Sequence, residues 1–441
     1  MRSIDREILR LALPALGALI AEPLFLLTDT ALVGHLGADA LAALGIAGTV
    51  LHTAIGLLVF LAYATTPAVA RALGAGDRPG AIRAGIDGLW LALGIGVLIA
   101  LVGIPTAWPL AAAFGSTPEV TAGATAFLLV SLAGIPAMLL VIAATGLLRG
   151  LQDTRTPLIV AVLGFAANAG LNALFIYGFG WGVAGSAAGT VVAQWGMAAV
   201  YLVIAVRAAR ATGVSLRPGL RGVTLVAASG GWLLLRTVSL RAAMLATVVV
   251  ATGMGVAELA TLQIALAVFS TVAFGLDALA IAGQAMIGHA LGGHDTVKVR
   301  QITSRLIWMG VWAGLIVGLV IAVLSPVLGP AFTGDAQVHA LLPLVALVMA
   351  AGIPLAGYVF VLDGVLIGAG DARYLALVGM ANLLVYGPLL VAVVLGGAGI
   401  AWLWAAFGFG YMGARAVTLG LRARTDRWVV VGAAASTPKT S

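Results

Sequence analysis

The sequence contains no cysteine and has few charged residues for its length. The absence of Cys among 441 residues excludes disulfides, thiol chemistry and cysteine-based metal or iron–sulfur sites. Asp, Glu, Lys and Arg make up 9% of the chain, whereas globular proteins carry about 25%. With 62% hydrophobic residues and a mean hydropathy of +1.14, so few charges cannot cover a soluble fold of this size. Cytoplasmic enzymes and nucleic-acid modules are therefore excluded.

Lysine is also scarce, since only Lys298 and Lys439 accompany the many arginines. The formal net charge of +7 could suggest a nucleic-acid partner, but the basic residues are scattered between long apolar runs. This distribution is typical of the loops of a polytopic membrane protein. The Arg-, Ala- and Gly-rich composition indicates a GC-rich, bacterial genome. The amino terminus mixes Asp5 and Glu7 with arginines, so we expect no cleavable signal peptide.

A transmembrane helix needs about 20 mostly apolar residues. Twelve such stretches are present, separated by short polar or glycine-rich breaks such as GHLGADA, FGSTPEV and GGHDTVK. We therefore predict an all-α polytopic membrane protein with 12 transmembrane helices. The predicted spans cover roughly 10–33, 43–70, 84–108, 120–147, 157–177, 183–206, 224–250, 259–288, 305–328, 338–362, 373–395 and 399–420.

The positions of the basic residues support this topology, because cytoplasmic loops carry an excess of Lys and Arg. If the amino terminus is cytoplasmic and the sides alternate, 21 of the 23 basic residues fall on the inside and the outside loops contain none. The two exceptions, Arg236 and Arg241, lie within the seventh span. We predict a multi-pass protein of the bacterial cytoplasmic membrane, surrounded by lipid, with both termini cytoplasmic and functional as a monomer.

The two halves of the chain repeat at a constant offset of 218 residues. ALGAGD at 72–77 aligns with ALGGHD at 290–295, and GLLRGLQDTR at 146–155 aligns with GVLIGAGDAR at 364–373. Each half has six spans, so we expect two six-helix lobes related by a pseudo-two-fold axis along the membrane normal, as in secondary transporters. The predicted organisation is an N-terminal lobe (1–206), a cytoplasmic inter-lobe linker (207–223), a C-terminal lobe (224–424) and a partly disordered cytoplasmic tail (425–441).

Polar residues inside the first lobe form the main candidate site, because intramembrane charge is costly and marks function. Asp29 lies near the outer end of the first span, and Glu22 lies on the same helix face. Asn168 and Asn172 share one face of the fifth span, and Thr190 lies at a similar depth in the sixth. A carboxylate removed from water can take up and release a proton as its surroundings change. The alternative is that the amides and the hydroxyl only join helices by hydrogen bonds.

Two prolines, Pro14 and Pro23, fall within the first span. Proline removes a backbone hydrogen bond and makes a helix easy to bend. The bend is either static or changes when Asp29 binds a proton.

The second lobe has a different set of intramembrane polar residues. We expect Arg236 to pair with Asp277 in a structural ion pair, which we favour over a substrate site. Asp363 is expected at the membrane interface. The secondary candidates in the seventh and eighth spans are Arg236, Arg241, Asp277 and Gln284.

No motif predicts an enzyme or a bound metal. HExxH, nucleophile-elbow and carboxylate-dyad patterns are absent, and the Gly-rich pieces lack the strand–helix context of a phosphate loop. We therefore expect no cofactor, no metal and no ATPase partner, only a coupling ion, with H⁺ preferred and Na⁺ possible.

Several long stretches resemble the multidrug and toxic compound extrusion (MATE) family. LLTDTALVGHLGADALAALGIA resembles the family's first-span signature, and GLLRGLQDTRTP with NAGLNALFIYGFGWGVAGSAAGTVVAQ its fourth-to-sixth-span region. LDGVLIGAGDARYLA is the counterpart in the second half. The similarity covers essentially the whole chain and is greatest to the bacterial DinF-like branch.

The resemblance implies cation-coupled efflux of organic, often cationic or amphiphilic, compounds through a V-shaped pair of six-helix lobes. The family's first-span acid falls on Asp29 and its first-span proline on Pro14. Its fifth-span Asn falls on Asn168 and its sixth-span Thr on Thr190. Asn172 departs from the pattern, since archaeal-type members often have Asp there. The seventh span also lacks the acid of sodium-coupled relatives, and both departures favour proton coupling.

Two other functions compete with a proton-coupled antiporter acting by alternating access. One is Na⁺-coupled efflux. The other is a lipid-linked precursor flippase or polysaccharide exporter of the same superfamily, for which only Arg236 and Arg241 would supply a basic cavity. A non-transporting receptor or scaffold is disfavoured because no sensory or catalytic domain is present.

Overall fold

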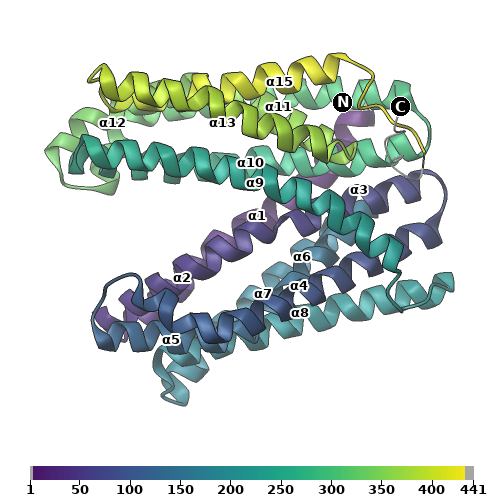
Figure 1. Ribbon diagram of the computed structural model, residues 1–441, viewed down its shortest axis with the longest axis horizontal. Helices are drawn as coiled ribbons and strands as arrows, with labels where there is room; N and C mark the ends of the chain where they lie inside the picture. The colour runs from purple at the N-terminus through teal and green to yellow at the C-terminus, as the bar shows by residue number, and fades with distance from the viewer. Residues whose placement is uncertain (1–2, 433–441) are drawn as a thin grey trace. The chain divides into compact units, whose positions relative to one another are not determined.

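A computed structural model describes residues 3–432, and every regular element among them is helical (Figure 1). The first half forms α1 (Ser3–Gly34), α2 (Ala38–Leu58), α3 (Phe60–Gly74), α4 (Arg78–Ala112), α5 (Pro118–Leu132), α6 (Ile135–Gly150), α7 (Arg155–Ala173), the π-helical η1 (Leu174–Gly178) and α8 (Gly182–Thr212). The second half forms α9 (Leu220–Met254), α10 (Val256–Gly292), α11 (Thr296–Phe332), α12 (Ala336–Gly368), α13 (Ala372–Leu395), α14 (Ile400–Ala405), η2 (Ala406–Tyr411) and α15 (Met412–Arg424). Residues 433–441 of the predicted cytoplasmic tail lie outside the described residues, so the disorder predicted for them stays a prediction.

The predicted all-α polytopic fold is confirmed. Within residues 3–432, 10 helical stretches are long and apolar enough to cross a membrane, with α2 and α3 counted together. The α5–α6 pair, bent by 52° at its break, makes an eleventh if it is one span. The twelfth predicted span, 399–420, is also helical, but η2 separates the short α14 from α15. Neither α14 nor α15 is long enough by itself to count as a membrane span.

The element boundaries repeat at the offset of the sequence duplication. The pair α2–α3 begins at Ala38 and ends at Gly74, while α10 begins at Val256 and ends at Gly292, each 218 residues later. The same shift relates α5–α6 to α12. Each half therefore follows one helical plan, although the first half breaks two helices that are continuous in the second.

The connections between helices repeat as well. Gly76 and His294, related by the offset, both have φ in the left-handed region, at +79° and +59°. Asp77 and Asp295, one residue later, both cap the next helix by accepting a hydrogen bond of 2.8 Å from a backbone N–H. This local geometry is the structural counterpart of the ALGAGD and ALGGHD motifs.

The chain packs as two compact units, whose division falls inside helices. We call residues 13–230 the N-unit, and the residues up to Ala12 together with those from Gly231 onward the C-unit. One boundary lies beside Pro14 in α1, and the other lies between Gly230 and Gly231 in α9. The stretch 207–223, predicted as a linker, lies wholly within the N-unit.

In the C-unit, small residues allow α11 to lie close against α12. Gly310, Gly314 and Gly318 recur every fourth residue and are buried on the face toward α12. A Cβ added at Gly314 would come 2.7 Å from the Cα of Pro354. Small residues at this spacing let helix backbones approach closely in lipid, where dispersion contacts stabilise the pair.

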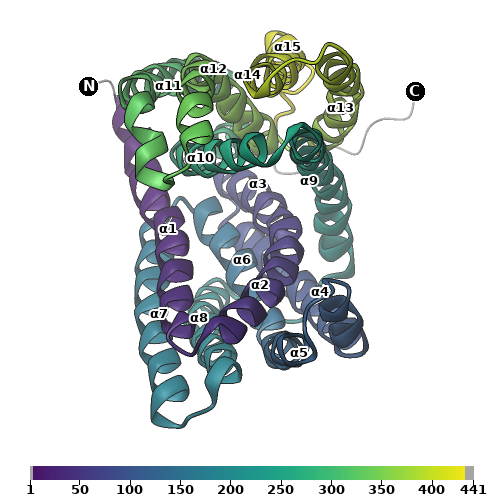
Figure 2. The ribbon, with the colours of Figure 1, turned by 90° about the vertical axis from the view of Figure 1, so that its left-hand side faces the viewer.

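In the N-unit, α7 lies beside α8, and α1 packs against α7 (Figure 2). The rings of Phe25 on α1 and Phe165 on α7 stack with centroids 5.1 Å apart. A Cβ at Gly185 of α8 would come 2.9 Å from the carbonyl carbon of Phe175. These contacts bring the polar residues of three helices together.

Candidate functional site

The polar site of the N-unit is centred on the carboxylate of Asp29. The side chain belongs to α1, is only 5% exposed, and accepts two hydrogen bonds at the same oxygen, Oδ1. One comes from Asn172 Nδ2 on α7 at 2.8 Å, and the other from the Ser186 hydroxyl on α8 at 2.5 Å. Asp29 thus connects α1 to α7 and α8 through residues that lie 143 and 157 positions away along the chain.

Asn168 and Thr190 extend this network along α7 and α8. Asn168 Nδ2 donates to Thr190 Oγ1 at 2.9 Å, and its Oδ1 accepts from Asn172 Nδ2 at 3.1 Å. Both asparagines are buried, with 3% and 0% exposed. The four residues singled out from the sequence therefore lie in one cluster, as their predicted depths indicated, although their role in coupling stays a prediction.

Ser186 is the member of the cluster that the sequence reasoning missed. It is fully buried and lies four residues before Thr190, so the two share one face of α8. That spacing was a usable signal, but a serine among small residues in a membrane helix more often serves helix packing.

One acceptor atom of the cluster has no donor within residues 3–432. Asn172 Oδ1 is buried without a hydrogen-bond donor among the described residues, although Asn172 Nδ2 is close to three acceptors. A buried acceptor without a donor is costly, so this site favours a ligand that brings a proton or a positive charge.

The remaining first-lobe candidates lie on α1. Pro14 and Pro23 are inside this helix, and Pro14 adjoins the boundary of the N-unit. The side chain of Glu22 lies outside the described part of the structure.

The equivalent positions in the C-unit hold different chemistry. The 218-residue offset places Thr247 at the position of Asp29, Tyr386 at that of Asn168 and Trp404 at that of Ser186. Thr247 and Tyr386 share a hydrogen bond of 2.7 Å, and both side chains are buried. The second half therefore has a hydroxyl, beside aromatic side chains, at the position where the first half has the Asp29 carboxylate.

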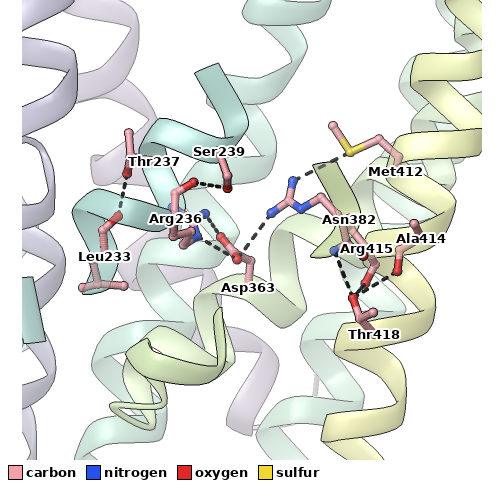
Figure 3. Close-up of polar contacts among 10 residues, drawn as sticks. All are labelled: Leu233, Arg236, Thr237, Ser239, Asp363, Asn382, Met412, Ala414, Arg415 and Thr418. Carbon is pink, nitrogen blue, oxygen red and sulfur yellow. Dashed lines mark hydrogen bonds and ion pairs between the residues drawn. The ribbon is translucent and has the colours of Figure 1, made fainter. Parts of the chain in front are cut away.

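A separate charged cluster lies in the C-unit, where Asp363 is shared by two arginines (Figure 3). Arg236 of α9 binds both carboxylate oxygens of Asp363 on α12, with 3.0 Å between Nε and Oδ1. Arg415 of α15 approaches from the other side, with its Nη2 3.3 Å from Oδ1. Asp363 was expected at the membrane interface, but it is buried with 6% exposed.

The other second-lobe candidates differ in burial and in their partners. Asp277, predicted to pair with Arg236, is half-buried and interacts electrostatically with Arg415. Arg241 is exposed, and Gln284 is buried with no partner for its Oε1 among the described residues. Arg236 therefore pairs with Asp363, beside Arg415, whereas its predicted contact with Asp277 stays a prediction.

Among the described residues, His, Asp and Glu side chains form no group of three or more that could hold a metal ion.

Comparison with known proteins identifies relatives over nearly the whole length. The sequence profile of the MatE family matches residues 14–174 and 235–393. "Protein DETOXIFICATION 44, chloroplastic" of Arabidopsis thaliana is 30% identical, and the alignment covers 99% of this chain and 86% of that protein. The "DNA damage-inducible protein F" of Escherichia coli (strain K12) is 29% identical over 67% of this chain and 65% of its own length.

Solved structures share the fold. The Vibrio cholerae MATE transporter VcmN in the bent form superposes with a TM-score of 0.87, at 22% identity and 97% and 98% coverage of the two chains. A MOP superfamily transporter from Pyrococcus furiosus gives a TM-score of 0.86 at 24% identity, with 96% of each chain covered.

Proposed function

The chain belongs to the MATE family of multidrug and toxic compound efflux transporters, and we propose that it exports organic, often cationic or amphiphilic, compounds in exchange for protons bound at Asp29. The family consists of transporters, so no catalytic step is needed. The observation that supports proton coupling is the buried Asp29 carboxylate, beside which Asn172 Oδ1 has no donor among the described residues. A proton supplies the missing donor and removes a charge that is costly in lipid.

Proton binding changes how α1 is held. The ionised carboxylate draws the Ser186 hydroxyl and the Asn172 amide to Oδ1 through charge-assisted hydrogen bonds. Protonation weakens these two bonds, which loosens α1 from α7 and α8. Because Pro14 and Pro23 leave gaps in the backbone hydrogen bonding of α1, this helix bends at low cost when it is released. The proton then binds in one state of the transporter, and the outgoing compound binds in the other.

Sodium coupling and flipping of lipid-linked precursors receive less support. At the position equivalent to Asp29 the second half offers Thr247, and the charged cluster of the C-unit contains two arginines, which repel Na⁺. A flippase for polyanionic substrates needs basic groups that are free to bind them. Both Arg236 and Arg415 are instead bound to Asp363.

The membrane arrangement is part of the proposal. The distribution of basic residues supports a bacterial cytoplasmic membrane protein with both termini inside, acting as a monomer on small organic molecules. No second chain is required to complete the Asp29 site, because all of its side chains come from one unit.

Reconstituted vesicles test the proposal through paired variants. We expect Asp29→Asn to abolish efflux of a cationic dye driven by an imposed pH gradient. Asp39→Asn, which removes an exposed carboxylate at the start of α2, serves as the control and should transport at the wild-type rate. Transport by Asp29→Asn at the wild-type rate would refute proton coupling at this site. Stimulation of the wild type by Na⁺ after collapse of the pH gradient would establish sodium coupling instead.

A further inference from the structure

An open groove lies in the C-unit, among α11, α12, α15 and the segment that follows α15. It has a volume of about 330 Å³, within the range of small-molecule sites. Its lining comes from the start of α11, Tyr358 of α12, the end of α15 and the segment after α15.

The segment that follows α15 is held in place by several contacts. Trp428 is buried with 4% exposed and donates from Nε1 to the carbonyl of Ala423 at 3.3 Å. The backbone N–H of Gly432 donates to the carbonyl of Leu291 at the end of α10, at 3.0 Å. These contacts fix the position of the segment that lines the groove.

The polar groups of the groove suit a single negative charge. Arg300 pairs with Asp426 at 2.5 Å, while Arg424 forms no ion pair with a described residue, so the lining has one excess positive charge. The Tyr358 hydroxyl has no hydrogen-bond partner within residues 3–432, and Gly420 leaves room for it, since a Cβ there would come 2.5 Å from this oxygen. A guanidinium and a free hydroxyl together match the oxygens of a phosphate group.

An apolar path leads away from this groove along the surface of α11. Ser304 of the groove is followed at helical spacing by Trp308, Trp312 and Ile316, which are 51%, 49% and 61% exposed. The two tryptophan rings lie 5.9 Å apart, and the guanidinium of Arg305 lies 4.8 Å from the centre of the Trp308 ring. Tryptophan followed by aliphatic residues is typical of a helix face that passes from the membrane interface into lipid.

We propose that this groove binds the headgroup of an anionic phospholipid, with Arg424 and Tyr358 on the phosphodiester and an acyl chain along Trp308 and Trp312. Basic pockets between transmembrane helices are the sites at which anionic headgroups bind. A phosphodiester carries one negative charge, which balances the excess charge of the lining. The occupant is a lipid because the exposed apolar path begins at the same helical turn. The site depends on the membrane-spanning fold and not on the coupling ion.

Lipid titration of the purified full-length protein tests the assignment by native mass spectrometry. We expect phosphatidylglycerol to bind more tightly than phosphatidylcholine. Arg424→Gln should weaken phosphatidylglycerol binding about tenfold, the factor expected for one charge-assisted hydrogen bond. Tyr358→Phe, which preserves packing, should weaken it by a smaller factor. Arg427→Gln, an exposed arginine of the same segment that does not line the groove, should bind as the wild type does.

Three results would overturn the assignment. Equal binding by Arg424→Gln and Arg427→Gln would show that the groove is not the site. Equal binding of phosphatidylcholine would remove the preference for an anionic headgroup. Displacement of phosphatidylglycerol by millimolar inorganic phosphate would identify a site for free phosphate in place of lipid. None of these readouts depends on transport, so they are separate from the test of Asp29.

Discussion

Asn172 on α7 donates a hydrogen bond of 2.8 Å to the Asp29 carboxylate on α1, while its own carbonyl oxygen is buried without a donor among the described residues. The two residues are 143 positions apart in the chain. Asn172 thus stabilises the ionised form of Asp29 and leaves one acceptor nearby unfilled. In the mechanism proposed above, a proton bound at Asp29 supplies the donor that Asn172 Oδ1 lacks.

Ser186 is predicted to be a positioning residue for Asp29. Ser186→Ala removes one of the two donors to Oδ1, and the loss of a hydrogen bond to a charged group corresponds to about 1.5–3 kcal/mol. We expect dye efflux to fall about tenfold and its pH dependence to move, while Ser186→Thr, which keeps a hydroxyl, restores both. If the pH dependence of Ser186→Ala matches that of the wild type, the serine acts only in packing.

Gly189 is predicted to keep α8 close to Asn172. A Cβ at this position would overlap the Asn172 amide oxygen and come 2.8 Å from its backbone nitrogen. Gly189→Ala should therefore separate α8 from α7 and strongly reduce pH-driven efflux. Gly196→Ala on the same helix, where a Cβ meets nothing within 4 Å, is the matched control and should retain transport. Comparable activity in the two variants would argue against this close packing.

The charged cluster of the C-unit is predicted to stabilise the fold. Arg236→Gln leaves the buried Asp363 with Arg415 alone, and breaking a buried pair costs about 3–5 kcal/mol. We expect the melting temperature of the detergent-solubilised protein to fall by several degrees. Arg241→Gln, five residues along α9 at an exposed position, should leave it unchanged. Equal melting temperatures for both variants would assign Arg236 no structural role.

The glycines of α11 are predicted to set its distance from α12. Gly314→Ala places a methyl group 2.7 Å from the Cα of Pro354, and overpacking of this kind costs about 1–3 kcal/mol. Thermal unfolding should show the loss. Gly387→Ala on α13 adds its methyl group to open space and should melt like the wild type. A melting temperature unaffected by Gly314→Ala would mean that the two helices can move apart freely.

Much of the fold could be predicted because the signals are local. Apolar runs of membrane length, basic loops and a constant offset are properties of the chain read in one dimension. They predicted the helical class, and the offset reappears in the helix ends, from Gly74 and Gly292 to the caps Asp77 and Asp295. The boundary between the compact units was harder to predict from the sequence, because it falls inside α1 and α9 and no loop marks it.

The N-unit site was predictable for the same reason, since Asp29, Asn168, Asn172 and Thr190 lie at one depth and an intramembrane carboxylate has few possible roles. What only the tertiary structure decided is partner choice. The sequence predicted Asp277 as the partner of Arg236 and placed Asp363 at the membrane interface. In the structure Asp363, 127 residues away from Arg236, forms the bidentate pair, with Arg415 beside it. Depth in a membrane follows from position along a helix, whereas contact between side chains also depends on how each helix is rotated about its axis. Packing of small residues decides that rotation, and hydropathy does not record it.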